Sequence, residues 1–376
     1  MRTQVVACAS GYGEGGMGAH LRQVVAQARS RGPVRYFCTA PAPDDPDGVG
    51  VPMGGVLRLL ALPPVRQSPA LRSHLYGDIF DRRVARRLPA ADSVHAFSGQ
   101  ALHTFAAVGG GTRRALECPT AHVRTVARRH AQAFAAYPLE RPWLGSAQID
   151  KSLAEYGRAD ACWVVSRYAW ESFLDAGVRP ERLRRRRLTV DLDRWRPPQA
   201  RSQGPLRVVY VGALSVAKGV PLLLDAFARL EDPDARLVLC GGCASRGMRV
   251  HLERCCARDP RVRLVQGDPL PHYQAASLYV HPSYQDGFGL APLEAAACGL
   301  PLVLSADSGV GEALAGPGAL VVPTGRLDAL VDLLRTLARN PERLAGLGAQ
   351  ARAAAVRWVC GGEGDAPCTS ATTSTV

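Results

Sequence analysis

Short apolar runs of strand length alternate with segments of helical periodicity from one end of the chain to the other. One clear helical face runs from Leu21 to Ala28, where apolar residues recur three, four and seven positions apart, and Gly32-Pro33 ends it. Such alternation is typical of α/β proteins with parallel sheets. The expected strands are 4–9, 34–38, 93–97 and 161–165 in the first half, and 206–211, 236–239, 262–265, 278–281 and 302–304 in the second.

The chain is long enough for two such domains. Its 376 residues exceed what a single hydrophobic core usually serves. Residues 198–205 are rich in proline, glutamine, arginine and glycine, and they predict a linker. Residues 1–197 and 206–358 then form an N-terminal and a C-terminal domain. Residues 359–376 lack periodicity and are expected to be a disordered or atypical tail.

Composition narrows the protein class only slightly. Hydrophobic residues make up 47% of the chain and charged residues 21%, as in ordinary globular proteins. No apolar run is long enough to cross a bilayer, and the first nine residues resemble a β-strand more than a signal peptide. We therefore expect a cytoplasmic protein.

The formal net charge is +13. A general bias towards arginine, an anionic ligand, an anionic membrane face or nucleic acid would each account for it. Nucleic acid is disfavoured because no known nucleic-acid-binding motif accompanies the charge. The arginine bias, an anionic ligand and peripheral contact with the inner face of a membrane all stay open. The densest basic run, residues 182–187, is expected to be a solvated loop.

The eleven cysteines do not indicate a metal centre. Most of them lie inside apolar stretches, where a free thiol behaves as a small hydrophobic group. Cys240 and Cys243, followed by Cys255-Cys256, have a spacing that fits no common zinc module. We expect no metal.

The most informative motif is residues 281–301, where a strand, a glycine-containing loop and a helix follow one another. Pro292 suits the first turn of the helix, and Gly299 with Pro301 ends it. The loop amides at the helix start predict a phosphate site at the carboxyl end of a parallel strand. The residues that would point these amides outward are Gly287, Phe288, Gly289 and Leu290.

Two carboxylates, Asp286 and Glu294, flank this loop. They are suited to accept hydrogen bonds from sugar hydroxyls on either side of the phosphates. The alternative is that Asp286 is a turn residue and that Glu294 complements the helix dipole.

A second motif covers residues 208–219 and leads into an apolar helix. Its strand ends at Gly212, and Lys218 stands just before the helix, where an ammonium group would neutralise a departing diphosphate. The alternative is an ordinary surface lysine.

A third motif lies between the first strand and the first helix. Gly11, Gly13 and Gly16 satisfy the dinucleotide pattern G-x-G-x-x-G, but no convincing acidic residue follows the second strand. A glycine-rich loop that faces a ligand of the other domain, through Gly15 and Gly16, fits equally well.

These motifs together resemble glycosyltransferase family 4, the retaining nucleotide-sugar enzymes with the GT-B fold. The resemblance runs from about residue 4 to residue 358, and the acid pair with Lys218-Gly219 is its most specific part. It implies two Rossmann-like α/β/α domains with parallel sheets that face each other across a cleft. The matching segments are 15–18, 155–160, 164–166, 190–197, 212–219, 286–294 and 308–312.

The resemblance also implies roles for individual residues. Glu294 would hold the ribose hydroxyls, Asp286 the transferred sugar, and Lys218 the diphosphate. Gly16 would let the N-terminal backbone close on that diphosphate. For the reaction centre there are two candidates, His122 in Pro-Thr-Ala-His and His95 in Ser-Val-His-Ala-Phe.

The chain departs from the family pattern at four places. Asp286 stands where the first acid is usually glutamate, which puts the preferred donor sugar in doubt. Ala213 replaces a phosphate-binding arginine, so Lys218 or an arginine of the N-terminal domain would carry more of the charge. Thr189 replaces a glycine. After Trp358 the usual returning helix is replaced, and we expect a truncated end.

The sequence therefore predicts a hexosyltransferase-type enzyme. It would move a sugar from a UDP- or GDP-type donor to an unidentified sugar, lipid-linked or small-molecule acceptor, with retention and without a metal or other cofactor. Two alternatives stay open: a degenerate nucleotide-sugar binder without activity, and a nucleotide-dependent oxidoreductase or epimerase.

Overall fold

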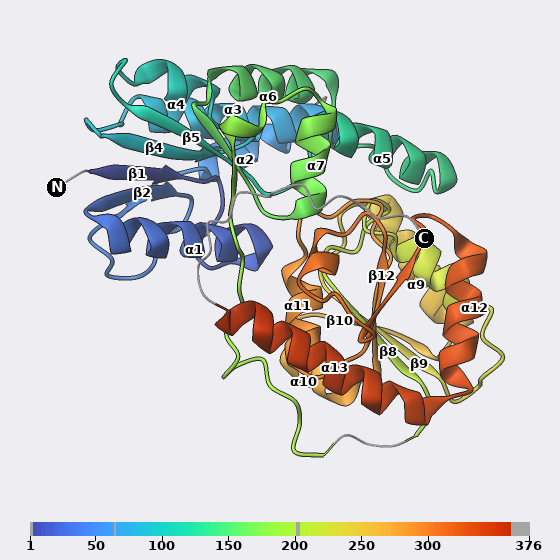
Figure 1. Ribbon diagram of the computed structural model, residues 1–376. Helices are drawn as coiled ribbons and strands as arrows, with labels where there is room; N and C mark the ends of the chain where they lie inside the picture. Colours follow the sequence, from blue (N-terminus) through green and yellow to red (C-terminus); the bar gives the residue numbers. More distant parts are fainter. Residues whose placement is uncertain (1–2, 64, 201–203, 362–376) are drawn as a thin grey trace.

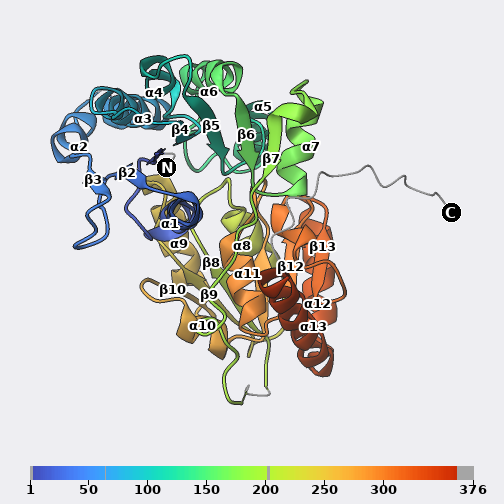
Figure 2. The same cartoon turned by 60° about the vertical axis from the view of Figure 1, so that its left-hand side comes forward.

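Two parallel β-sheets form the framework of the protein in a computed structural model that describes residues 3–63, 65–200 and 204–361 (Figure 1). The sheet of the N-terminal half lies above that of the C-terminal half in both views (Figures 1 and 2). Every pair of neighbouring strands is parallel. The α/β class with parallel sheets is confirmed.

The N-terminal sheet has the order β3-β2-β1-β4-β5-β6-β7. Its strands are β1 (Gln4–Ala7), β2 (Val34–Cys38), β3 (Gly48–Gly50), β4 (Ser93–Phe97), β5 (Arg113–Cys118), β6 (Ala161–Val164) and β7 (Leu183–Arg185). Its helices are α1 (Gly15–Arg31), α2 (Gly54–Leu60), α3 (Pro69–Ala85), α4 (Leu102–Ala107), α5 (Val123–Ala136), α6 (Ser146–Arg158) and α7 (Arg167–Asp175), with 3₁₀ turns at Val65–Gln67 and Pro180–Arg182.

The two faces of this sheet are covered by different helices. Val5 and Ala7 pack with α2 to α4, α6 and α7, whereas Val6 and Cys8 pack with the apolar face of α1. Because successive side chains of a strand point to opposite faces, one short run such as Gln4–Ala7 supplies both layers of the core.

The C-terminal sheet has the order β10-β9-β8-β11-β12-β13. Its strands are β8 (Arg207–Val211), β9 (Arg236–Cys240), β10 (Val262–Val265), β11 (Leu278–His281), β12 (Leu302–Ser305) and β13 (Ala319–Val322). Its helices are α8 (Val220–Ala228), α9 (Arg246–Arg258), α10 (Leu270–Ala275), α11 (Leu290–Ala297), α12 (Leu327–Ala338) and α13 (Pro341–Cys360), with a 3₁₀ turn at Gly309–Glu312. Residues of α8, α9, α12 and the first part of α13 cover one face, and those of α10, α11 and the later part of α13 cover the other.

Four strands were not anticipated from the sequence: β3, β5, β7 and β13. The division into domains 1–197 and 206–358 stays a prediction. Between β7 and β8 the described part of the chain contains no helix or strand, and part of the expected linker, residues 201–203, lies outside the described residues.

The expected tail begins later than predicted. Helix α13 continues through Val359 and Cys360, because its apolar residues pack along α11. Near its end, Trp358 donates a hydrogen bond from Nε1 to the carbonyl oxygen of Leu188 at 2.8 Å, and its ring stacks on Phe288. The rest of the expected tail, residues 362–376, lies outside the described residues.

The basic run 182–187 is not a solvated loop, and that prediction is wrong. Residues Leu183–Arg185 form strand β7 at the sheet edge. Arg186 is buried and forms a bidentate ion pair with the fully buried Glu117 of β5, at 2.5 and 2.7 Å. His95 lies 3.0 Å from the same carboxylate. A buried carboxylate needs such partners, and the basic run supplies one of them.

None of the described helices combines the length and the apolar character needed to cross a bilayer.

We expect Arg186→Met to destabilise the protein strongly, because it would leave Glu117 buried without its guanidinium partner. Removal of one partner of a buried ion pair costs about 3–5 kcal/mol. The free energy of unfolding, measured by urea denaturation, should fall by that order. The matched control is Arg184→Met, two residues away and exposed, which should change it little. Equal losses in both variants would contradict the assigned role of Arg186.

Candidate functional site

Loops at the carboxyl ends of the two sheets meet at Gly287. A Cβ atom there would collide with the carbonyl oxygen of Pro119 and lie 2.6 Å from Cα of Thr120, in the loop that follows β5. Ser166, which follows β6, donates a hydrogen bond from Oγ to the carbonyl oxygen of Gly287. The loop predicted to bind phosphate therefore lies against the N-terminal half, and only glycine fits there.

Asp286 lies between two basic side chains beside this contact. Its Oδ2 is 2.7 Å from Nζ of Lys218 and 3.0 Å from Nε2 of His281. Burial alone would raise the pKa of Asp286, but Lys218 and His281 outweigh it and hold that pKa below its ordinary value. The structure thus brings together two residues predicted from separate motifs, and Asp286 is an ionised carboxylate at neutral pH.

Close backbone contact fixes the loop that carries Lys218. Gly219 has φ of 70°, and a Cβ atom there would collide with the carbonyl oxygen of Pro282 at the end of β11. The amide of Lys218 donates to Oγ of Ser215 at 3.2 Å. Gly212, at the end of β8, places its own carbonyl oxygen where a Cβ atom of Gly241 would lie. These contacts hold the ammonium group opposite Asp286.

The start of α11 has the geometry expected of an anion site. The helix begins at Leu290, after Gly289 in a left-handed conformation with φ of 95°. Among the described residues, the amides of Phe288 and Gly289 donate no hydrogen bond. Free amides at a helix start attract an anion, and here they adjoin the Lys218–Asp286 pair.

Glu294 lies one turn into α11 and is largely buried. Its Oε2 accepts a hydrogen bond from the hydroxyl of Tyr273 at 3.1 Å. Burial raises the pKa of Glu294 to about 7, despite this hydrogen bond. The side chain can therefore change its charge near neutral pH, which a surface carboxylate would not do.

The predicted glycines of the N-terminal half have open space around them. Helix α1 begins at Gly15, and a Cβ atom at Gly15 or Gly16 would meet nothing within 4 Å, although the φ of 59° at Gly15 favours glycine. At Gly18, in contrast, a Cβ atom would collide with the carbonyl oxygen of Gly11. A ligand role for Gly15 and Gly16 stays a prediction.

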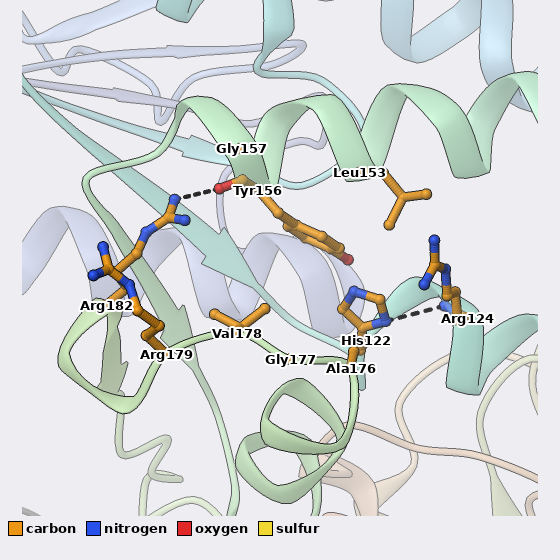
Figure 3. Close-up of a pocket in the computed structure, with 10 residues that line it drawn as sticks. All are labelled: His122, Arg124, Leu153, Tyr156, Gly157, Ala176, Gly177, Val178, Arg179 and Arg182. Carbon is orange, nitrogen blue, oxygen red and sulfur yellow. Dashed lines mark hydrogen bonds between the residues drawn. The ribbon is translucent and has the colours of Figure 1, made fainter.

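Neither predicted histidine contacts Asp286 or Lys218 among the described residues. His95 lies in β4 and faces Glu117. The ring of His122, at the start of α5, packs against Tyr156 with a centroid distance of 4.9 Å (Figure 3). It also packs against Phe173, with a centroid distance of 5.1 Å. The structure places both rings within the packing of the N-terminal half, and a catalytic role for either stays a prediction.

Sequence reasoning missed three residues around Asp286. His281 contacts it directly, although only its place at a strand end had been noted. Arg129 of α5 forms an ion pair at 2.7 Å with Asp307, whose carbonyl oxygen accepts from the amide of Asp286. A phosphate-binding arginine of the N-terminal half, suggested by the loss of one at Ala213, stays a prediction.

The third missed residue, Glu140, bridges the two halves. One carboxylate oxygen accepts from the amide of Val216 at 2.8 Å, in the loop that carries Lys218. The other accepts from Oγ of Ser245 at 2.9 Å, at the start of α9. Such contacts join residues far apart in sequence, so no local pattern signals them.

A cluster of Asp78, Asp81 and His103 has the side chains of a metal site. The ammonium group of Lys151 lies 2.9 Å from Asp78 and 3.0 Å from Asp81. The ammonium group of Lys151 therefore neutralises part of the charge of these carboxylates and joins α6 to α3.

Residues 191–354 match the family model described as glycosyl transferases group 1. Residues 191–354 are thus similar to group 1 glycosyl transferases, and the chain as a whole has the GT-B fold. The GT-B fold implied by the resemblance is confirmed, and the family model supports the resemblance over residues 191–354.

Curated relatives align with less than half of the chain. D-inositol 3-phosphate glycosyltransferase from Kribbella flavida is 34% identical over 150 residues, which are 36% of this chain and 35% of the relative. The protein of the same name from Xylanimonas cellulosilytica is 31% identical over 196 residues, 45% and 46% of the two chains. The aligned parts thus span less than half of these relatives' lengths.

Solved GT-B structures match almost the whole chain. Sucrose-phosphate synthase from Thermosynechococcus elongatus has a TM-score of 0.72 at 20% identity, and the match covers 96% of this chain and 95% of that one. HepE from Anabaena, solved with UDP-glucose, has a TM-score of 0.68 at 17% identity and 96% coverage of both chains. At this identity the likeness shows the fold.

We expect Gly287→Ala to weaken the contact between the two halves, because the added Cβ atom has no room beside Pro119 and Thr120. Overpacking of this kind costs about 1–3 kcal/mol. The midpoint of thermal unfolding should fall, and small-angle scattering should show a larger radius of gyration. Gly311→Ala is the control, because a Cβ atom there meets nothing within 4 Å. An unchanged scattering curve and midpoint for Gly287→Ala would refute the contact.

Proposed function

We propose that the protein is a glycosyltransferase of the hexosyltransferase type, which moves a sugar from a nucleoside diphosphate sugar to an acceptor hydroxyl. The observation that carries the proposal is the arrangement of Lys218, Asp286 and the free amides at the start of α11. Lys218 supplies a positive charge there, Asp286 can accept hydrogen bonds from sugar hydroxyls, and the free amides can bind an anion. Retention of the anomeric configuration is part of the proposal and rests on the family resemblance.

The positive groups would stabilise the leaving diphosphate. When the bond between the sugar and the diphosphate breaks, negative charge grows on the phosphate oxygens. Lys218 and the amides of Phe288 and Gly289 are fixed before the reaction, so they can stabilise this charge without reorganisation. When the donor binds, the ammonium group of Lys218 would contact the diphosphate as well as Asp286. On this basis we propose that the transfer needs no metal ion.

The carboxylates would hold the donor's hydroxyls. Asp286 is ionised and adjoins the amides, which suits the transferred sugar. Glu294 lies further along α11, in a position suited to the ribose. The HepE structures contain UDP or UDP-glucose, which supports a nucleotide sugar as the donor here. The acceptor would enter from the N-terminal half, and its identity stays open.

Two further expectations remain proposals: a cytoplasmic location and peripheral contact with a membrane. The structure supplies one surface that suits such contact. Leu57, Leu59 and Leu62 are more than half exposed in and after α2, beside Arg58 and Arg66. Exposed leucines among arginines fit an anionic lipid surface.

We expect Lys218→Ala to lower kcat about 10²- to 10³-fold, the usual loss when a preorganised charge at the leaving group is removed.

Before activity is assayed, a thermal-shift screen of UDP, GDP, ADP and their sugar conjugates without metal should identify the donor. Glu294→Ala should abolish most of that shift. Full transfer in both variants would sink the assignment, and binding without transfer or donor hydrolysis would identify a degenerate binder. Turnover of a nicotinamide would favour the oxidoreductase alternative.

Donor affinity should depend on pH through Glu294. Because burial raises the pKa of Glu294 to about 7, the side chain is ionised at pH 8 and largely protonated at pH 6, where it accepts hydrogen bonds poorly. Affinity for the nucleotide sugar should therefore fall about tenfold from pH 8 to pH 6. Titration calorimetry at the two values measures this, and Glu294→Gln should give a flat profile. A wild-type profile as flat as that of the variant would contradict the assigned role.

A further inference from the structure

A separate hollow lies in the N-terminal half, between the start of α5, the end of α6 and the segment after α7 (Figure 3). We call it the α5–α7 pocket. Its volume of about 310 Å³ is at the lower end for small-molecule sites. Tyr156 lies just before β6, and Arg179 and Arg182 just before β7, so the pocket extends towards the amino ends of the strands. Within the described ranges no residue that lines the pocket contacts Asp286 or Lys218, so the pocket is distinct from that site.

The lining is positively charged. It contains three arginines and no aspartate or glutamate. Arg182 donates to the carbonyl oxygens of Tyr156 and Ala159, but the side chains of Arg124 and Arg179 form no hydrogen bond or ion pair within the described ranges. Figure 3 shows Arg124 on one side of the pocket and the other two arginines opposite. An anion between them would be attracted from both sides.

His122 supplies a hydrogen-bond donor at the back of the pocket. The residue is only 3% exposed, and its Nδ1 accepts from the amide of Arg124 at 3.4 Å. Burial lowers the pKa of His122 to about 4, so the ring is neutral at pH 7 and its proton is on Nε2. No described residue accepts a hydrogen bond from Nε2. Nε2 is accessible from the pocket, so an oxygen atom of a ligand could accept its hydrogen bond.

Two further features define the ligand's chemistry. Helix α5 has fourteen residues, and its positive N-terminal end, at Val123, adjoins the pocket. The wall beside it is apolar, formed by Leu153, the ring of Tyr156 and Val178. A phosphate group would suit the helix end and the guanidinium groups, and an apolar body would suit the wall.

We propose that the α5–α7 pocket binds a phosphate group, free or as the monoester of a small molecule, through Arg124, Arg179 and Nε2–H of His122. The site is independent of the proposed transferase reaction. The ligand's phosphate would lie against the start of α5, and the body of a monoester would lie on Tyr156 and Val178.

Titration calorimetry with inorganic phosphate and with phenyl phosphate, in Tris buffer, tests the proposal on the full chain. We expect both probes to bind wild type. The double variant Arg124→Gln/Arg179→Gln should weaken binding by about tenfold or more, as the loss of charged hydrogen bonds does. Arg254→Gln, an exposed arginine on α9, is the matched control and should bind as wild type does. Lys218→Ala should also retain binding, because it alters only the Asp286 site.

Tighter binding of phenyl phosphate would identify a monoester as the ligand, and equal binding would identify free phosphate; both support the site. The proposal is overturned if neither probe binds, if the double variant binds as well as Arg254→Gln, or if Lys218→Ala abolishes binding. The last result would assign the phosphate to the Asp286 site and so leave the proposed transferase function intact.

Discussion

The close backbone contact at Gly287 is the constraint on which the arrangement of the two halves depends. The carbonyl oxygen of Pro119 occupies the space that any side chain at this position would need. A side chain there would separate the loop after β11 from the loop after β5. Because the same loop carries Asp286 and leads into α11, the contact between the halves also determines the geometry of the candidate site.

Each half contains a carboxylate that stays ionised although its burial favours the neutral acid. Glu117 is held by Arg186, and Asp286 by Lys218 with His281. In each case desolvation would favour the neutral acid, and fixed positive groups outweigh it. The two carboxylates differ in their exposure to solvent. Glu117 is fully buried and joins strands of the sheet. Lys218 and Asp286 remain partly exposed, so a ligand could replace one of them as the partner of the other.

Much of the framework and the core of the site could be predicted from the sequence. Nine strands followed from apolar runs, and Lys218 with Asp286 followed from two loops at strand ends, because parallel strands bring such loops to one edge. Residues whose roles depend on distant partners could not be predicted. Arg186 looked solvated until Glu117 was found behind it, and Glu140 had no local pattern. His122 matched a motif, but the packing of α6 and α7 decides where its ring points.

The end of α13 has a mechanical consequence. Trp358 contacts Leu188 and Phe288, whereas Glu140 contacts Val216 and Ser245, beyond the end of helix α5, which reaches over the C-terminal half (Figure 1). A rotation of one half about an axis near Trp358 would barely move the atoms there. It would leave the packing at Phe288 in place and separate Glu140 from the loop that carries Lys218.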